Sequence, residues 1–126
     1  MGYLLDTHVA LWVLKGESIS DKAREVLDDV TTEIFVSIAS AWEIAIKIST
    51  GKLKYTGGVS AFLEDIKSND FSLLSVKEAH IELLEELRYH HRDPFDRLLI
   101  ASAKTEGMTI LTADKNIHKY DVPYVW

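Results

Sequence analysis

The sequence predicts a single α/β domain in which helices cover both faces of a mostly parallel sheet. Short apolar runs alternate with longer segments whose apolar residues recur at helical spacing. The chain has no internal repeat and no linker, so its 126 residues suit one domain, residues 1–126. Strands that alternate with helices favour parallel pairing with helical crossovers, and the excess of helices indicates a sandwich with three layers.

The first half of the chain is expected to form two strands and three helices. In order, these are a strand at Tyr3–Leu5, helices at His8–Leu14 and Asp21–Val30, a strand at Glu33–Ser37 and a helix at Ile38–Ser49. Gly16 is a stop for the first helix, and Ser20 is a good N-cap for the second. The third helix is apolar nearly all round, so we expect it to be largely buried, with Trp42 in the core.

The second half is expected to add two strands, three helices and two basic loops. In order, these are a loop at Lys52–Tyr55, a helix at Val59–Ser68, a strand at Phe71–Ser75, a helix at Lys77–Tyr89, a loop at His90–Arg92, a helix from Pro94 towards Gly107, a strand at Thr109–Thr112, a turn or short helix at Lys115–Lys119 and an extended segment at Val122–Trp126. Ser75 and Glu78 match the spacing of a capping box. Asp93 is a good N-cap before Pro94, which suits the first helical position, and Gly107 is a typical helix stop.

Composition restricts the function. Fourteen Lys and Arg against twenty Asp and Glu give a net charge of −6, the wrong sign for a simple electrostatic nucleic-acid binder unless a divalent cation inverts the local charge. The chain has no Cys, which fits a reducing compartment, and we expect a cytoplasmic protein. No apolar run approaches the length of a membrane span, and the N-terminal segment lacks the basic start of a signal peptide.

Four acids are expected to meet at one edge of the sheet. Asp6 follows the first predicted strand and Asp114 follows the fourth, while Glu43 lies on the apolar helix after the second strand and Asp96 opens the helix before the fourth. Ligands of open parallel sheets bind beyond the carboxyl ends of the strands. Clustered carboxylates repel one another unless a hard cation such as Mg²⁺ or Mn²⁺ lies between them. The pattern therefore indicates metal-assisted phosphoryl chemistry.

Each acid except Asp6 also has a structural explanation. Asp96 favours the helix dipole, and Asp114 suits an Asx turn. Glu43 is compatible with a capping box with Ser40 and with an i,i+4 pair with Lys47. The metal-site hypothesis therefore depends on the joint placement of the four acids.

Other polar residues carry weaker signals. None of the five His residues has a partner at zinc spacing, and none is assigned a catalytic role. Trp12 and Trp42 occur at helical spacing and are expected in the core, although base stacking is an alternative. The basic residues that flank the acids in sequence are candidates for RNA phosphate contacts, with solvated surface as the default: Lys47, Lys52, Lys54, Arg88, Arg92 and Arg97.

The assembled sequence resembles the PIN-domain toxins of the VapC type, from bacterial toxin–antitoxin pairs. The resemblance covers nearly the whole chain and is carried by LLDTHVALW at residues 4–12, SIASAWEIAIK at 37–47 and HRDPFDRLLIASAKTEGMTILTADKNI at 91–117. The third segment is the most specific of the three. The resemblance implies a PIN-like α/β/α sandwich with a central, mostly parallel sheet of about five strands, a homodimer, and a cognate antitoxin that blocks the site.

The resemblance also implies roles for individual residues. The acidic positions of the family fall on Asp6, Glu43, Asp96 and Asp114, which would bind Mg²⁺ or Mn²⁺ and support hydrolysis of RNA, with Asp6 and Asp96 as the most direct ligands. Thr7 and Thr112 match hydroxyl positions that orient the acids. Asp93 matches a second acid of the DPFDR version, and its role stays open.

The first hypothesis is therefore a metal-dependent endoribonuclease that acts as a toxin. An aspartyl-phosphate enzyme with Asp6 as nucleophile is weakened because His8 stands where a DxD motif needs its second acid. A PIN-like scaffold that binds RNA or protein without catalysis would be favoured by loss of an acid, and all four are present. A DNA-directed nuclease stays open, since the acids contact metal and phosphate and not the 2′-hydroxyl.

Overall fold

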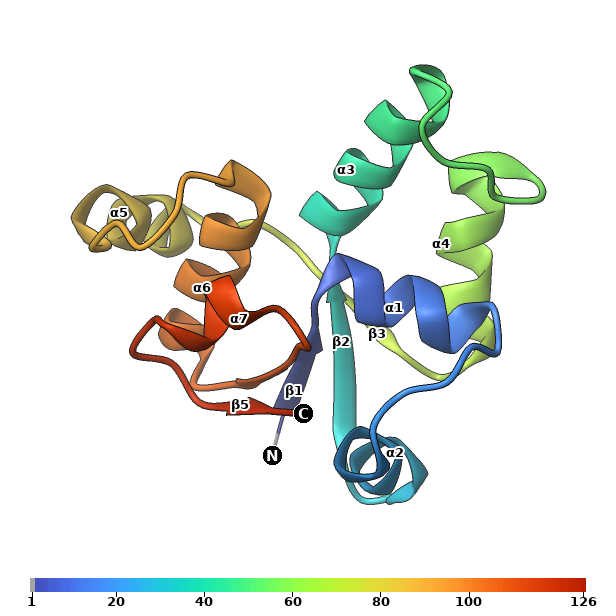
Figure 1. Ribbon diagram of the computed structural model, residues 1–126, viewed down its shortest axis with the longest axis horizontal. Coiled ribbons are helices and arrows are strands. Elements are labelled where there is room, and N and C mark those ends of the chain that lie inside the picture. Colours follow the sequence, from blue (N-terminus) through green and yellow to red (C-terminus); the bar gives the residue numbers. More distant parts are fainter. Residues whose placement is uncertain (1) are drawn as a thin grey trace.

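The computed structural model describes residues 2–126 and shows a five-stranded sheet between two groups of helices (Figure 1). The elements, in chain order, are β1 (Gly2–Leu5), α1 (Thr7–Leu14), α2 (Asp21–Asp28), β2 (Glu33–Ser37), α3 (Ile38–Ser49), α4 (Gly58–Ser68), β3 (Ser72–Leu74), α5 (Glu78–Glu86), α6 (Pro94–Glu106), β4 (Thr109–Leu111), α7 (Lys115–His118) and β5 (Tyr124–Val125). The strand order is β3-β2-β1-β4-β5, and every pair is parallel. The predicted fold class is confirmed.

The strand β1 is at the centre because both of its faces are apolar. Leu5 packs with α1, α3 and α4 on one side of the sheet, and Leu4 packs with α6 and α7 on the other. Figure 1 shows the first group of helices to the right of the sheet and α5, α6 and α7 to its left. Leu5 is in register with Val36 of β2 and Leu111 of β4, so the residues that follow these strands share one edge.

The C-terminal segment forms an additional strand. The sequence predicts an extended segment at Val122–Trp126, and the structure pairs Tyr124 and Val125 with β4 as a short parallel edge strand. The predicted turn or short helix at Lys115–Lys119 is the four-residue helix α7.

The expectation that α3 is largely buried is wrong for one of its faces. Ile38, Trp42 and Ile46 are 41%, 60% and 40% exposed, and they recur every four residues along the helix. The other faces of α3 pack against α1, α4 and α6, which leaves this stripe in solvent. Trp42 contacts Phe95 edge-on, with ring centroids 5.0 Å apart, and does not enter the core.

The helix α5 begins and ends differently from the prediction. The Ser75–Glu78 capping box is absent; instead, the ring of His80 accepts the backbone N–H of Lys77 at 3.2 Å. The helix ends at Glu86 and not at Tyr89, so residues 87–93 form a loop. No helix among the described residues is both long and apolar enough to cross a membrane.

Candidate active site

Asp6 lies between β1 and α1 and is 4% exposed. Its Oδ1 accepts the N–H of Val9 at 2.7 Å, which caps α1, and its Oδ2 accepts the hydroxyl of Thr112 at 2.5 Å. Burial raises the pKa of Asp6 above its usual range, and these hydrogen bonds offset part of the increase. The carboxylate is therefore held in place, but its charge is only partly compensated.

Thr112 connects Asp6 to Asp114. The hydroxyl oxygen of Thr112 accepts the backbone N–H of Asp114 at 3.0 Å, while its proton is donated to Asp6. Asp114 is the N-cap of α7, where its Oδ1 accepts the N–H of Asn116 at 2.8 Å. Asp114 therefore both caps a helix, as a structural Asp would, and lies next to Asp6.

Glu43 joins the same edge through Thr7, the residue after Asp6. Its Oε1 accepts the hydroxyl of Thr7 at 2.7 Å, and its Oε2 is 3.1 Å from the Lys47 ammonium, which is the predicted i,i+4 pair. Thr7 Oγ1 is also 2.9 Å from Ser40 Oγ; because the single Thr7 proton goes to the carboxylate, Ser40 donates to Thr7. The predicted capping box with Ser40 is wrong, since Ser37 caps α3 and Ser40 lies inside the helix.

Asp96 lies in the first turn of α6, with Oδ2 3.0 Å from Nε2 of His91. Burial raises the pKa of Asp96 to about 6, the charges of Asp93 and Asp114 add to the increase, and His91 opposes it. Asp93 is the N-cap of α6 and accepts the N–H groups of Phe95 and Asp96 at 2.9 and 3.0 Å. Its cap role is thus visible, and its charge also acts on the neighbouring acid.

The four acids predicted from the sequence lie at one edge of the sheet. The charge of Asp114 raises the pKa of both Asp6 and Asp96, which places Asp114 within electrostatic reach of each of these two carboxylates. Glu43 is coupled to this group by the hydrogen bond to Thr7. As the side chains lie, no three His, Asp or Glu residues between positions 2 and 126 are close enough together to hold a metal ion.

The chemistry of these donors fits Mg²⁺ or Mn²⁺. All four side chains offer only carboxylate oxygens, the ligands that these hard cations prefer. Burial raises the pKa of Asp6 and Asp96, and the hydrogen bonds to these carboxylates offset only part of the increase. A divalent cation at this edge would supply the missing positive charge.

Two residues near this edge, His91 and Arg97, were missed or misjudged from the sequence. His91 contacts Asp96, and its Nδ1 is 2.9 Å from the hydroxyl of Tyr120. Arg97 was a candidate for RNA contact, but it is 4% exposed and donates to the carbonyl oxygens of Leu87 and Arg88 at 2.9 and 3.2 Å. No periodic pattern signals these contacts, because they depend on the path of the loop 87–93.

The raised pKa of Asp96 predicts a pH-dependent effect on stability. The pKa is about 6 in the folded protein against about 3.9 for a free Asp side chain, so ionisation of Asp96 destabilises the fold as the pH rises through this window. Asp96→Asn does not titrate there. In urea unfolding with EDTA, we expect the free energy of unfolding of this variant, relative to the wild type, to be higher at about pH 7.5 than at about pH 4.5. A difference that stays constant with pH would contradict the raised pKa.

Comparison with known proteins gives one family match. A model of the PIN domain family matches residues 3–123. No curated protein sequence matches the chain at a significant level.

Several solved structures share the fold. A chain of the VapBC2 complex from Rickettsia felis, bound to a DNA fragment from its promoter, superposes with a TM-score of 0.77 at 18% identity, over 99% of this chain and 98% of that one. DNA-bound VapBC from Salmonella typhimurium gives 0.75 at 15% identity, over 99% and 97%. VapBC-1 from nontypeable Haemophilus influenzae gives 0.71 at 16% identity, also over 99% and 97%. At these identities the likeness shows a shared fold.

Proposed function

The chain belongs to the PIN domain family, and from this membership and its acidic edge we propose that it is a metal-dependent endoribonuclease, the toxin of a toxin–antitoxin pair. The observation that carries the proposal is the placement of Asp114 at the carboxyl ends of β1 and β4, where Thr112 links it to Asp6 and its charge acts on both Asp6 and Asp96. Structural capping alone does not require three acids at one edge, two of them, Asp6 and Asp96, with raised pKa values.

The residues of the site divide into ligands and residues that orient them. Asp6 and Asp96 are the proposed direct ligands of Mg²⁺ or Mn²⁺, and Glu43 and Asp114 complete the set. Thr112 holds Asp6, and Thr7 holds Glu43, so the hydroxyls limit the rotation of the two buried carboxylates. When bound, the metal activates water and neutralises charge on the phosphodiester.

Partners follow from the same proposal. The solved relatives are VapBC complexes, which supports a cognate antitoxin as partner. We propose a homodimer in the cytoplasm as well. The exposed stripe of Ile38, Trp42 and Ile46 on the helix that carries Glu43 is an apolar surface suited to protein contact.

The test is cleavage of total RNA by the purified protein with Mg²⁺, with Mn²⁺ and with EDTA. We expect discrete fragments with a metal and none with EDTA, and we expect Asp96→Asn to lose them. Single-stranded DNA of matched length tests the alternative of a DNA-directed nuclease. Cleavage of this DNA as fast as RNA would favour that alternative over an endoribonuclease. If neither the wild type nor Asp96→Asn cleaves RNA with either metal, the catalytic proposal fails and a PIN-like scaffold without catalysis is the better account.

A further inference from the structure

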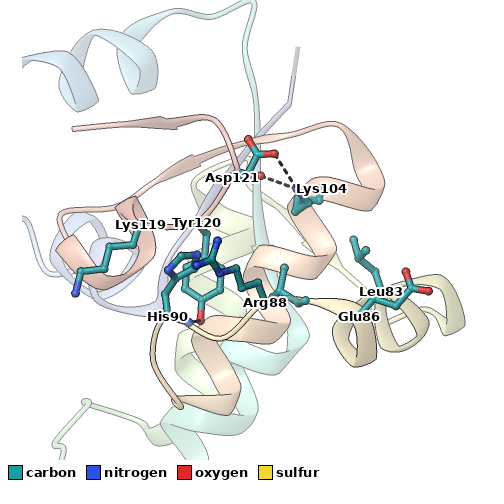
Figure 2. A pocket seen from close by; sticks show the side chains of 9 residues that line it. Leu83, Glu86, Arg88, His90, Lys104, Lys119, Tyr120 and Asp121 are labelled. Atoms are coloured by element: carbon teal, nitrogen blue, oxygen red, sulfur yellow. Dashed lines mark hydrogen bonds and ion pairs between the residues drawn. The ribbon is translucent and has the colours of Figure 1, made fainter.

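A pocket on the α5–α6 side of the sheet lies close to the acidic edge but contains none of its acids. It encloses about 450 Å³ between the end of α5, the loop 87–93, α6 and the segment after α7. Figure 2 shows Arg88 and His90 of the loop beside Tyr120, with Lys119 to one side and Glu86 and Leu83 to the other. We call it the Arg88 pocket.

The charge of the Arg88 pocket is opposite to that of the whole protein. It is lined by three basic residues, Arg88, Lys104 and Lys119, and two acidic ones, Glu86 and Asp121, on a chain with a net charge of −6. The Lys119 ammonium is at the rim, pointing away from Arg88 and His90 and 3.5 Å from the amide oxygen of Asn116 (Figure 2). Lys104 is already engaged by Asp121, at 2.6 Å to its carbonyl oxygen and 3.9 Å to its carboxylate, as the dashed lines of Figure 2 show. Across residues 2–126, no carboxylate lies within ion-pair distance of Arg88 or Lys119.

The wall of this pocket is fixed by buried groups. Arg97 lies beneath the loop and donates to the carbonyl oxygens of Leu87 and Arg88, and to the Tyr120 hydroxyl at 3.1 Å. The ring of His90 packs edge-on against Tyr120, with centroids 4.7 Å apart. The backbone from which Arg88 and His90 project is therefore held in one arrangement before any ligand arrives, which lowers the entropy cost of binding.

Two hydrogen bonds connect the Arg88 pocket to the acidic edge. The Tyr120 hydroxyl is 2.9 Å from Nδ1 of His91, and Nε2 of His91 is 3.0 Å from Asp96. On the other side, α7 has Asp114 at its start and Lys119 just past its end, about 7 Å apart along the helix axis. Since a stacked strand rises about 3.4 Å per nucleotide, one strand can reach both sites within a few nucleotides.

Resting on the proposed function, we propose that the Arg88 pocket binds a backbone phosphate of the RNA strand close to the phosphate that is cleaved. Arg88 attracts the phosphate by charge, the His90 ring offers an N–H donor, and Lys119 adds positive charge at the rim of the pocket. The contact is to the backbone, so it sets the position of the strand and carries no base preference. It also gives an acidic protein a local attraction for a polyanion.

The test measures binding of a short fluorescein-labelled single-stranded RNA by anisotropy in EDTA, where cleavage is blocked. Arg88→Gln/Lys119→Gln is compared with a matched double variant, Lys22→Gln/Lys67→Gln, on α2 and α4 at the other side of the sheet. All four side chains are exposed, so both variants are expected to fold. We expect the pocket variant to bind about tenfold more weakly, and the slope of log K against log salt to fall by about 1, while the control changes little.

The outcomes separate this inference from the proposed function. If the wild type cleaves RNA and both double variants bind equally well, the pocket inference fails and the function stands. If the protein binds RNA through the pocket but cleaves none, the inference stands and the catalytic proposal fails. Absence of RNA binding by the wild type, or full displacement of the RNA by low millimolar inorganic phosphate, would overturn the inference.

Discussion

Replacing Asp6 with Asn is expected to abolish RNA cleavage and to leave the protein at least as stable as the wild type. Asn is an equally good N-cap, so its amide oxygen still accepts the N–H of Val9, and its NH₂ group faces the Thr112 hydroxyl. The buried charge disappears, and with it the cost that raises the pKa of Asp6. Losing a proposed direct metal ligand is expected to lower the cleavage rate by at least about 100-fold.

The measurement combines single-turnover cleavage with thermal unfolding in EDTA. Asp70→Asn is a matched control, because Asp70 precedes β3 at the opposite edge of the sheet and its positive φ of 60° suits Asn. The control is expected to keep full activity. Cleavage by Asp6→Asn at the wild-type rate, or loss of its fold together with its activity, would show that Asp6 is a structural cap and not a ligand.

The predictable parts of the fold are those in which every residue of an element favours the same secondary structure and the same degree of burial. Leu4 and Leu5 are apolar on both sides of β1, which requires a central strand. The edge strand β5 has two residues and only one neighbour, so its short pattern predicts no more than an extended segment. The exposed face of α3 was not predictable. The sequence shows that the helix is apolar nearly all round, but it does not show which of its faces pack against other elements.

The site was predictable where it depends on topology. Parallel strands end at the same edge, so Asp6 and Asp114 can meet if β1 and β4 are neighbours. The register of Leu5 with Leu111 makes them neighbours, and Thr112 completes the link. The contact of His91 with Asp96 was not predictable in this way. It depends on the conformation of the loop 87–93, and that conformation is set by Arg97 from the following helix.

Replacing Arg97 with Gln is expected to destabilise the fold more than any change at the exposed surface. The guanidinium fills its site with hydrogen bonds to two backbone carbonyls and to Tyr120, and it stacks 3.7 Å from the ring centre of Tyr89. Gln is shorter and lacks the planar fork, so it leaves the carbonyls of Leu87 and Arg88 without donors. We expect a loss of about 2 kcal/mol, which corresponds to a fall in Tm of about 8 °C.

Arg92→Gln is the control for this effect, because Arg92 is exposed in the same loop and its substitution removes the same charge. Thermal unfolding should separate the two variants clearly, and Arg97→Gln should also show faster amide hydrogen exchange across residues 87–93. The loop carries His91 to Asp96 and Arg88 to the pocket, so RNA affinity should fall together with this protection. Equal Tm values for Arg97→Gln and Arg92→Gln would mean that the Tyr120 contacts alone hold the loop, and that the buried cation is dispensable for its shape.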